Sequence, residues 1–320
     1  MWTFDPIFKT IIWGGDKIAA YKGLKTDQKS IGESWELSGV EGSESVVADG
    51  PDKGMTISEL IKRDGADLLG KKNFQKYGYS FPLLIKFIDA NTDLSVQVHP
   101  SDELAQERGS KFGKTEMWYV IGADKGARLA NGFNREVDPK EYGRLVETGE
   151  IMGVLNFSEV KQGDVFFIPA GRVHAIGSGC FVAEIQETSD ITYRLYDYHR
   201  KDKDGNERQL HTKEAFDAIN FNDTEGSAIE YKLRRDLPVN LVTSPFFTTN
   251  LYQIDHEVMR DYSEWDTFVV IICTKGVATI TSAKGSVELT QGHTVLVPAS
   301  CRSVTIAPKG VFEALETFIK

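Results

Sequence analysis

Short apolar runs recur along the whole chain and predict β-strands. Nine runs of four to six residues are rich in Val, Ile, Phe and Tyr, and each is closed by Gly, Pro, Asn or Asp. They cover residues 83–88, 94–98, 117–121, 165–168, 181–185, 191–196, 268–272, 277–280 and 294–297. This pattern predicts an all-β sandwich or barrel.

Helix-start signals are fewer, and they lie between the predicted strands. Thr56 is followed three residues later by Glu59, which is the pattern of a capping box. The other signals are Ser101 before a helix that Gly109 would end, Pro139 directly after Asp138, and a short helix after Thr212. We therefore expect helical insertions on a β scaffold, and a solvated turn at the charged residues 201–206.

One motif occurs twice and indicates a duplicated domain. Residues 163–169 and 292–298 each run from Gly through five residues, including an apolar run, to Pro. The interval of 129 residues between the copies is too long for a solenoid repeat. The first copy is followed by His174, whereas the second has Ser303 at the matching place. Any function of this imidazole is therefore confined to the first copy.

The polar stretch 220–227 separates the two copies. The chain has 320 residues, and a single core usually stops growing at roughly 250–300 residues. We predict a first domain, residues 1–225, with a catalytic barrel and helical insertions, and a second domain, residues 226–320, with a smaller, metal-free barrel.

Composition narrows the classes of function. The 37 Lys and Arg against 47 Asp and Glu give a net charge of −10, which argues against nucleic-acid binding. No apolar run reaches the roughly 20 residues of a membrane span, and the first residues lack the pattern of a signal peptide. The three Cys are far apart and in no C-x-x-C motif, which favours free thiols and a cytoplasmic protein.

Four side chains from separate segments are candidate metal ligands. Gln97 and His99 alternate with apolar residues and would project from one strand face, although a solvent-facing strand has the same pattern. His174 follows a Pro-x-Gly turn, and Glu116 heads another strand, where by itself it would be a surface carboxylate. Two neutral imidazoles, an amide and a carboxylate would leave a divalent cation with a net charge of about +1, so it would remain a Lewis acid.

Charged residues interrupt other predicted strands. Lys86 lies inside an apolar strand, where it must either reach solvent or be partnered, because burial disfavours its charge. Glu184 and Arg194 occupy two further strands and would supply an acid and a cation if both face inward. A structural salt bridge between Glu184 and Arg194 is the alternative. We expect the tryptophans to be packing residues outside the site: Trp13, Trp35 and Trp118. A positive charge that attracts a substrate into the pocket could come from four residues: Lys86, Lys114, Arg172 and Arg194.

The motifs together resemble a known family. Gln97-x-His99-Pro100, Lys114-x-Glu116, the turn before His174 and the segment from Glu184 through Asp190 to Arg194 are similar to those of type I mannose-6-phosphate isomerases, the short bacterial form of the cupin superfamily. The likeness extends from Trp13 to Tyr198 and more faintly through the rest of the chain. It implies two cupin-type (jelly-roll) barrels, an all-β fold with helical insertions.

The resemblance also implies an activity and a site. The family's zinc ligands would map to Gln97, His99, Glu116 and His174, with one Zn2+ per chain, and its active-site arginine to Arg194. Pocket residues would be Lys86, Lys114, Glu184 and Asp190. The expected reaction is the reversible aldose–ketose isomerisation of mannose 6-phosphate and fructose 6-phosphate, through an enediol that needs electrostatic stabilisation.

Two other classes of function remain open. Two His and one carboxylate also ligate iron in non-haem oxygenases, although Gln97 would occupy a position that such enzymes leave for oxygen. A non-catalytic sugar-phosphate sensor would keep the barrel and lose turnover. The expected partner is a small sugar phosphate, with no nucleic acid and no membrane, and the chain is expected to be a monomer or a weak homodimer.

Overall fold

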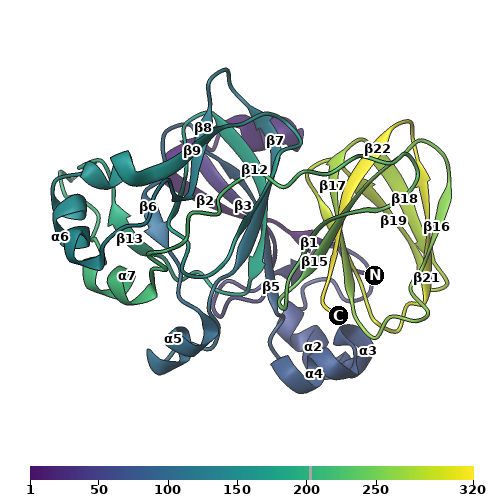
Figure 1. The fold of residues 1–320 in the computed structure, drawn as a ribbon. Coiled ribbons are helices and arrows are strands. Elements are labelled where there is room, and N and C mark those ends of the chain that lie inside the picture. The colour runs from purple at the N-terminus through teal and green to yellow at the C-terminus, as the bar shows by residue number, and fades with distance from the viewer. Residues whose placement is uncertain (202–203) are drawn as a thin grey trace.

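Two lobes of β-sheet lie side by side in the computed structural model, which describes residues 1–201 and 204–320 (Figure 1). The first lobe has a six-stranded sheet in the order β10-β7-β12-β5-β3-β2 and a five-stranded sheet in the order β13-β6-β11-β8-β9. Its strands are β2 (Ile7–Gly15), β3 (Ile31–Ser38), β5 (Leu83–Asp89), β6 (Val96–Val98), β7 (Glu116–Ala123), β8 (Arg128–Phe133), β9 (Leu155–Glu159), β10 (Val165–Ile168), β11 (His174–Ile176), β12 (Cys180–Glu187) and β13 (Tyr193–Tyr196), beside the small pair β1 (Phe4–Asp5) and β4 (Val46–Val47).

The second lobe also has two sheets. They run in the orders β14-β15-β22-β17-β20 and β16-β21-β18-β19. Their strands are β14 (Val239–Thr243), β15 (Thr248–Ile254), β16 (Val258–Asp261), β17 (Val269–Lys275), β18 (Val277–Ser282), β19 (Gly285–Thr290), β20 (Thr294–Val297), β21 (Ser303–Pro308) and β22 (Phe312–Phe318).

The two lobes repeat one topology. The neighbour order β10-β7-β12-β5 in the first lobe matches β20-β17-β22-β15 in the second, and β6-β11-β8-β9 matches β16-β21-β18-β19. The repeated Gly-to-Pro motif forms β10 and β20, each of which lies at the edge of its sheet. The predicted all-β, two-barrel fold is confirmed. The boundary between residues 225 and 226 lies in the connection between α7 and β14, and it stays a prediction.

Four of the α-helices among the described residues begin where the sequence signals them, and three others were not predicted. Thr56 and Glu59 form a complete capping box, Ser101 accepts from Leu104 N–H, and Asp138 accepts from Lys140 N–H. The helices are α1 (Lys17–Tyr21), α2 (Ile57–Asp64), α3 (Ala66–Leu69), α4 (Lys71–Tyr77), α5 (Asp102–Glu107), α6 (Pro139–Glu147) and α7 (Thr212–Ala218), with a 3-10 turn η1 (Glu150–Val154). The predicted turn at 201–206 includes residues 202 and 203, which lie outside the described residues.

The six-stranded sheet is covered on both faces, which explains why its central strands lack polar alternation. In β5, Ile88 belongs to the interior of the first lobe, whereas Ile85 and Phe87 belong to an apolar cluster that also contains Val270 and Ile272 of the second lobe. All residues of β5 and β12 are buried for this reason. The sheet therefore separates the interior of the first lobe from a core that the two lobes share.

Polar contacts add to this shared core. Lys22 Nζ donates to Glu36 Oε1 at 2.7 Å and also to the carbonyl oxygen of Gly292 in the second lobe, and Lys22 and Glu36 are both buried. Tyr119 Oη donates to Glu313 Oε1 at 2.9 Å. The second lobe thus supports the sheet whose other face looks into the first lobe.

Candidate functional site

Three neighbouring strands place polar side chains on the inner face of the first lobe. β12 lies between β5 and β7, and the register sets Glu184 opposite Lys86 on one side and opposite Trp118 on the other. Glu116 lies on the same face as Trp118 because side chains two residues apart in a strand point the same way. Two acids and a lysine therefore meet inside the lobe.

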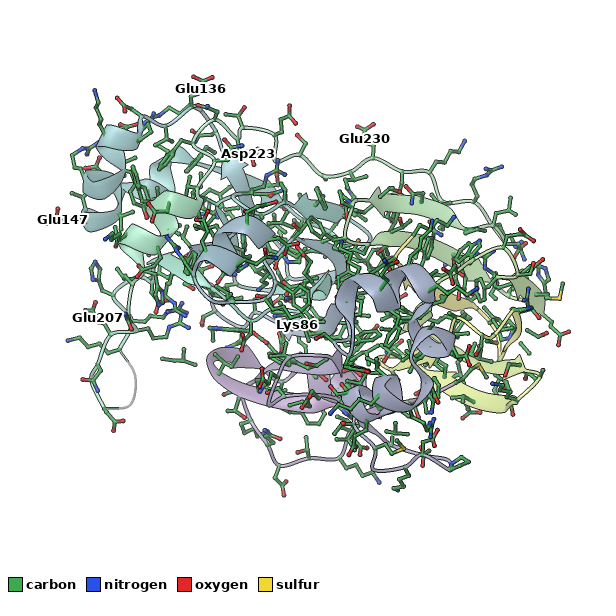
Figure 2. All side chains as sticks on the ribbon, turned by 90° about the horizontal axis from the view of Figure 1, so that it is seen from below. Lys86, Glu136, Glu147, Glu207, Asp223 and Glu230 are labelled. Atoms are coloured by element: carbon green, nitrogen blue, oxygen red, sulfur yellow. The ribbon has the colours of Figure 1, made fainter. Side chains whose placement is uncertain are left out.

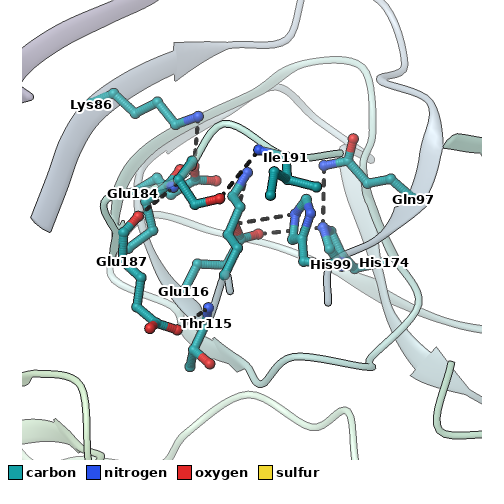
Figure 3. A network of polar contacts seen from close by, with 12 residues as sticks. Lys86, Gln97, His99, Thr115, Glu116, His174, Glu184, Glu187 and Ile191 are labelled. Atoms are coloured by element: carbon teal, nitrogen blue, oxygen red, sulfur yellow. Dashed lines mark hydrogen bonds and ion pairs between the residues drawn. The ribbon is translucent and has the colours of Figure 1, made fainter. Parts of the chain in front are cut away.

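Three predicted metal ligands, His99, Glu116 and His174, converge in this interior (Figure 3). Their ligand atoms all lie within 4.8 Å of one another. Glu116 Oε1 is 3.4 Å from His174 Nε2, and Glu116 Oε2 is 3.5 Å from His99 Nε2. These three side chains are at most 1% exposed. They form a buried, converging set of donor atoms that is well suited to one metal ion.

The protonation state of the two imidazoles in this triad fits a cation. Burial lowers the pKa of His174 to about 4 and lowers the pKa of His99 well below its usual range, so both imidazoles are neutral. His174 Nδ1 is 2.9 Å from the carbonyl oxygen of Arg172 and donates to it, which leaves the Nε2 lone pair facing the triad. Burial, and then the Glu184 carboxylate, raise the pKa of Glu116.

Unsatisfied polar atoms mark the same place. Within the described residues, both oxygens of Glu116 and both ring nitrogens of His99 are buried without a hydrogen-bond partner. Leaving such groups unpaired costs about 1–3 kcal/mol each, and more for a charged group. A divalent cation could bind the Glu116 carboxylate and the Nε2 atom of His99 that faces it, so the residues fit a metal.

Gln97 lies beside the triad, across the β6–β11 pair from His174. Its amide nitrogen is 3.2 Å from His174 Nε2. A half-turn of the amide would exchange its nitrogen and oxygen and present the oxygen, as a metal ligand requires. The structure therefore places all four predicted ligand side chains together, three of them with donor atoms already converging.

Lys86 is buried and partnered and does not reach solvent. Its Nζ is 2.9 Å from Glu184 Oε1 and 3.6 Å from Glu33 Oε2, and Glu184 Oε2 accepts from Trp118 Nε1 at 2.7 Å. Burial alone would lower the pKa of Lys86, but Glu184 and Glu33 outweigh it and raise that pKa. Figure 2 shows Lys86 among the interior side chains, whereas the exposed Glu207 lies at the rim.

A cavity of about 200 Å3 opens beside these groups. The predicted site residues in its lining are Lys86, Gln97, Lys114, Glu184, Asp190 and Arg194. Lys114 is 4% exposed, and its Nζ is 3.4 Å from Glu116 Oε2. A larger groove, of about 640 Å3, lies between the N-terminal segment and the β18–β19 hairpin, and none of the predicted site residues lines it.

Arginines gather at one end of this cavity. Arg194 Nε donates to Ser95 Oγ at 3.3 Å and Nη1 donates to the carbonyl oxygen of Gln209 at 2.9 Å. Arg200 and Arg208 both bind the carboxylate of Asp197. The alternative of a Glu184–Arg194 salt bridge is wrong, because Glu184 binds Lys86, and no ion pair of Arg194 is found among the described residues. Two of these three guanidinium groups thus share one carboxylate, and Arg194 has none in the described part of the chain.

Some sequence interpretations need correction. Arg172 supplies no charge to the cavity, because Asp223 binds it at 2.7 and 2.8 Å. Trp13 and Trp35, which were expected to be core or entrance packing, line the cavity. Four polar lining residues were not among the predicted site residues: Glu33, Ser95, Thr192 and Arg208. Period-two alternation from Trp35 to Glu33 could have revealed one of them, whereas no spacing signals Arg208, which follows a loop.

A second cluster lies in the second lobe. Asp236, Asp255 and His256 offer atoms within 4.8 Å of one another, but they are partly or largely exposed. Arg235 already binds Asp255. The histidines outside the triad, His199, His211, His256 and His293, all lie outside helices and strands.

Comparisons with known proteins agree with this geometry. The family model for the catalytic domain of type I phosphomannose isomerase matches residues 1–160, and the model for the cupin domain of mannose-6-phosphate isomerase matches residues 239–313. The mannose-6-phosphate isomerase ManA of Bacillus subtilis is 36% identical over 92% of this chain and 92% of its own length. A mannose-6-phosphate isomerase of Streptococcus mutans is 34% identical over 91% of this chain and 90% of its own length.

Solved structures give the same relationship. The crystal structure of mannose 6-phosphate isomerase from Bacillus subtilis superposes with a TM-score of 0.88, at 29% identity, over 99% of this chain and 98% of that one. A putative mannosephosphate isomerase from Archaeoglobus fulgidus, at 23% identity and a TM-score of 0.79, shares the fold. No helix among the described residues is long and apolar enough to cross a membrane.

Proposed function

Because the chain belongs to the type I phosphomannose isomerase family, we propose that it interconverts mannose 6-phosphate and fructose 6-phosphate in the cavity of the first lobe. The observation that carries this proposal is the buried triad of His99, Glu116 and His174, in which His99 and Glu116 lack hydrogen-bond partners among the described residues, next to the buried Lys86–Glu184 pair. This arrangement joins a metal-binding set to fixed charges beside one small cavity.

The bound metal is proposed to be one zinc ion per chain, held by Gln97, His99, Glu116 and His174. Two neutral imidazoles suit zinc, and the absence of thiolates is typical of catalytic rather than structural zinc sites. When bound, zinc would supply Lewis acidity toward a substrate oxygen. The side chains would stabilise charge, transfer the proton and bind the phosphate.

Isomerisation moves a proton between C1 and C2 of the sugar and builds negative charge on the neighbouring oxygens. The ammonium groups of Lys86 and Lys114 are fixed inside the lobe and would stabilise that charge without reorganising. Glu184 is a poor base, because one of its oxygens binds Lys86 and the other binds Trp118.

Asp190 is the proposed proton carrier. It lines the cavity, and no hydrogen bond or ion pair of its side chain is recorded in the described part of the chain. Its carboxylate is therefore available to take a proton from the carbon of a bound sugar.

The substrate phosphate is proposed to lie at the arginine end of the cavity. Arg200 and Arg208 share the single carboxylate of Asp197, and Arg194 has no carboxylate partner among the described residues, which leaves this end with an excess of positive charge. A guanidinium matches phosphate oxygens in a bidentate manner. Binding there would leave the C1–C2 end of the sugar for the lysines and the metal.

The catalytic domain would span residues 1–225 and the supporting domain residues 226–320. The cytoplasm is the proposed location, since the three cysteines, Cys180, Cys273 and Cys301, are free. The proposed assembly is a monomer or a weak homodimer, which light scattering can test.

A coupled assay tests the function. Zinc-loaded protein should convert mannose 6-phosphate into fructose 6-phosphate and catalyse the reverse reaction, and Asp190→Asn should lose most turnover while it keeps zinc. Binding of the sugar phosphate without turnover would support a sensor instead. Iron content with oxygen uptake would support an oxygenase, and either result would overturn the isomerase proposal.

A further inference from the structure

A pair of carboxyl groups holds the backbone on both sides of Lys114. Asp102 Oδ1 accepts from the N–H of Gly113 at 2.7 Å, and Glu187 Oε2 accepts from the N–H of Thr115 at 2.8 Å. The N–H of Glu187 donates in return to the carbonyl oxygen of Thr115 at 3.1 Å. The three residues before β7 are thus fixed from α5 on one side and from the end of β12 on the other.

Close packing allows this segment little freedom. A Cβ atom added at Gly113 would lie 2.5 Å from the backbone of Ser101 and Asp102. The N–H of Lys114 donates to the carbonyl oxygen of Pro100 at 3.0 Å. Because the backbone is held at 113, 114 and 115, the side chains that leave it at Lys114 and Glu116 start from fixed positions.

Glu187 is buried without a counter-charge. It is 5% exposed, and it forms no salt bridge among the described residues. Burial raises the pKa of Glu187 to about 8, Asp102 raises it further, and the hydrogen bond from Thr115 partly opposes them. Near neutral pH its carboxyl group is therefore largely protonated, and the group can accept from Thr115 with one oxygen and donate toward Asp102 with the other.

We propose that Glu187 is a positioning residue for the isomerase site, which sets the direction of Lys114 and Glu116 by holding the backbone of Thr115 (Figure 3). Lys114 Nζ is 3.4 Å from Glu116 Oε2, so a shift of this segment moves the ammonium and the proposed metal ligand together. Glu187 itself does not line the cavity. The catalytic part of this inference rests on the proposed function, and its geometric part does not.

The test compares Glu187→Ala with Glu187→Gln. A glutamine side chain offers a carbonyl oxygen to Thr115 and an amide N–H to Asp102, so it reproduces the protonated acid, whereas alanine offers neither. We expect Glu187→Ala to lower kcat about 100-fold, as a displacement of about 1 Å can, with less change in KM and with zinc content retained. We expect Glu187→Gln to stay within about threefold of the wild-type kcat.

Glu313→Ala is the control, because it also deletes a carboxyl group that accepts side-chain hydrogen bonds, from Tyr119, Thr274 and Gln253, but in the second lobe. It should lower thermal stability without lowering kcat. The inference is wrong if Glu187→Ala keeps the wild-type kcat, if Glu187→Gln is as impaired as Glu187→Ala, or if Glu313→Ala loses as much kcat at equal stability.

Crystal structures of the two Glu187 variants give a readout that is independent of turnover. The backbone at Thr115 should be displaced in Glu187→Ala and unchanged in Glu187→Gln. If wild-type protein has no isomerase activity, the proposed function fails, while this structural comparison still decides the positioning role. An unmoved segment in Glu187→Ala would overturn it.

Discussion

Lys86 and Glu184 face each other across the β5–β12 pair, and their side chains form a buried ion pair of 2.9 Å. Both are less than 10% exposed, and the pair lies on the inner face of the sheet that also carries Glu116. A buried pair of this kind is costly to break, because removal of one partner leaves an uncompensated charge.

Lys86→Met should therefore destabilise the protein by about 3–5 kcal/mol, since the carboxylate of Glu184 is left unpaired. Lys86→Met combined with Glu184→Gln should recover part of that loss, because the neutral amide keeps an acceptor for Trp118. Urea unfolding measures both changes. Equal stability of the single and double variants would contradict the interpretation of a buried, charged pair.

Stability should depend on pH through Glu187. Its pKa is raised from 4.5 to about 8 by burial, so between these values the unfolded state gives up a proton that the folded state keeps. The contribution of Glu187 is therefore present in full below pH 4.5 and is lost as the pH rises through about 8. The free energy of unfolding of the wild type should fall by a few kcal/mol relative to Glu187→Gln over this interval. Parallel curves would contradict the raised pKa.

Removal of metal should lower the melting temperature. Zinc at about 100 times its dissociation constant adds roughly 2.7 kcal/mol of stability if it binds only the folded state. His174→Ala should lose this response, because it removes a buried donor of the triad. Thermal unfolding with chelator and with added zinc provides the check, and a wild type that is indifferent to both would speak against a metal at this place.

Substitutions at the arginine end of the cavity should change the affinity for the sugar phosphate more than the rate of the chemical step. Arg208→Ala should raise KM for the sugar phosphate and weaken inhibition by inorganic phosphate, with a smaller effect on kcat, because the phosphate lies away from the reacting carbons. Arg63→Ala is a control at an exposed ion pair in α2, and it should change neither constant. A fall in kcat with unchanged KM for Arg208→Ala would place the phosphate elsewhere.

Local signals in the sequence predicted part of the secondary structure, but not the helices α1, α3 and α4. The strand β10 (Val165–Ile168) has the predicted bounds, and Thr56, Ser101 and Asp138 cap their helices as expected. These features depend on neighbouring residues alone, namely an apolar run closed by turn residues or a side-chain acceptor before a first turn. The duplicated motif likewise predicted two related barrels, which the matching strand orders confirm.

The sequence could not predict which side chains meet when their strands lie far apart in the chain. Whether Lys86 reaches solvent or meets a carboxylate depends on the register of β5 against β12, two strands that are nearly 100 residues apart. The same register decides that Glu184 binds Lys86 and leaves Arg194 without a carboxylate. Arg208 reaches the cavity through a loop held by Asp197, and no periodic pattern encodes that contact.

The central claim is that one divalent ion is bound among His99, Glu116 and His174, with Gln97 beside them. X-ray data collected on both sides of the zinc absorption edge from zinc-soaked crystals test it directly. The account predicts one strong anomalous peak in the first lobe, within about 2.0–2.2 Å of a nitrogen of each imidazole and of a Glu116 oxygen. An empty triad, or a peak only at the exposed Asp236, Asp255 and His256 cluster, would contradict it.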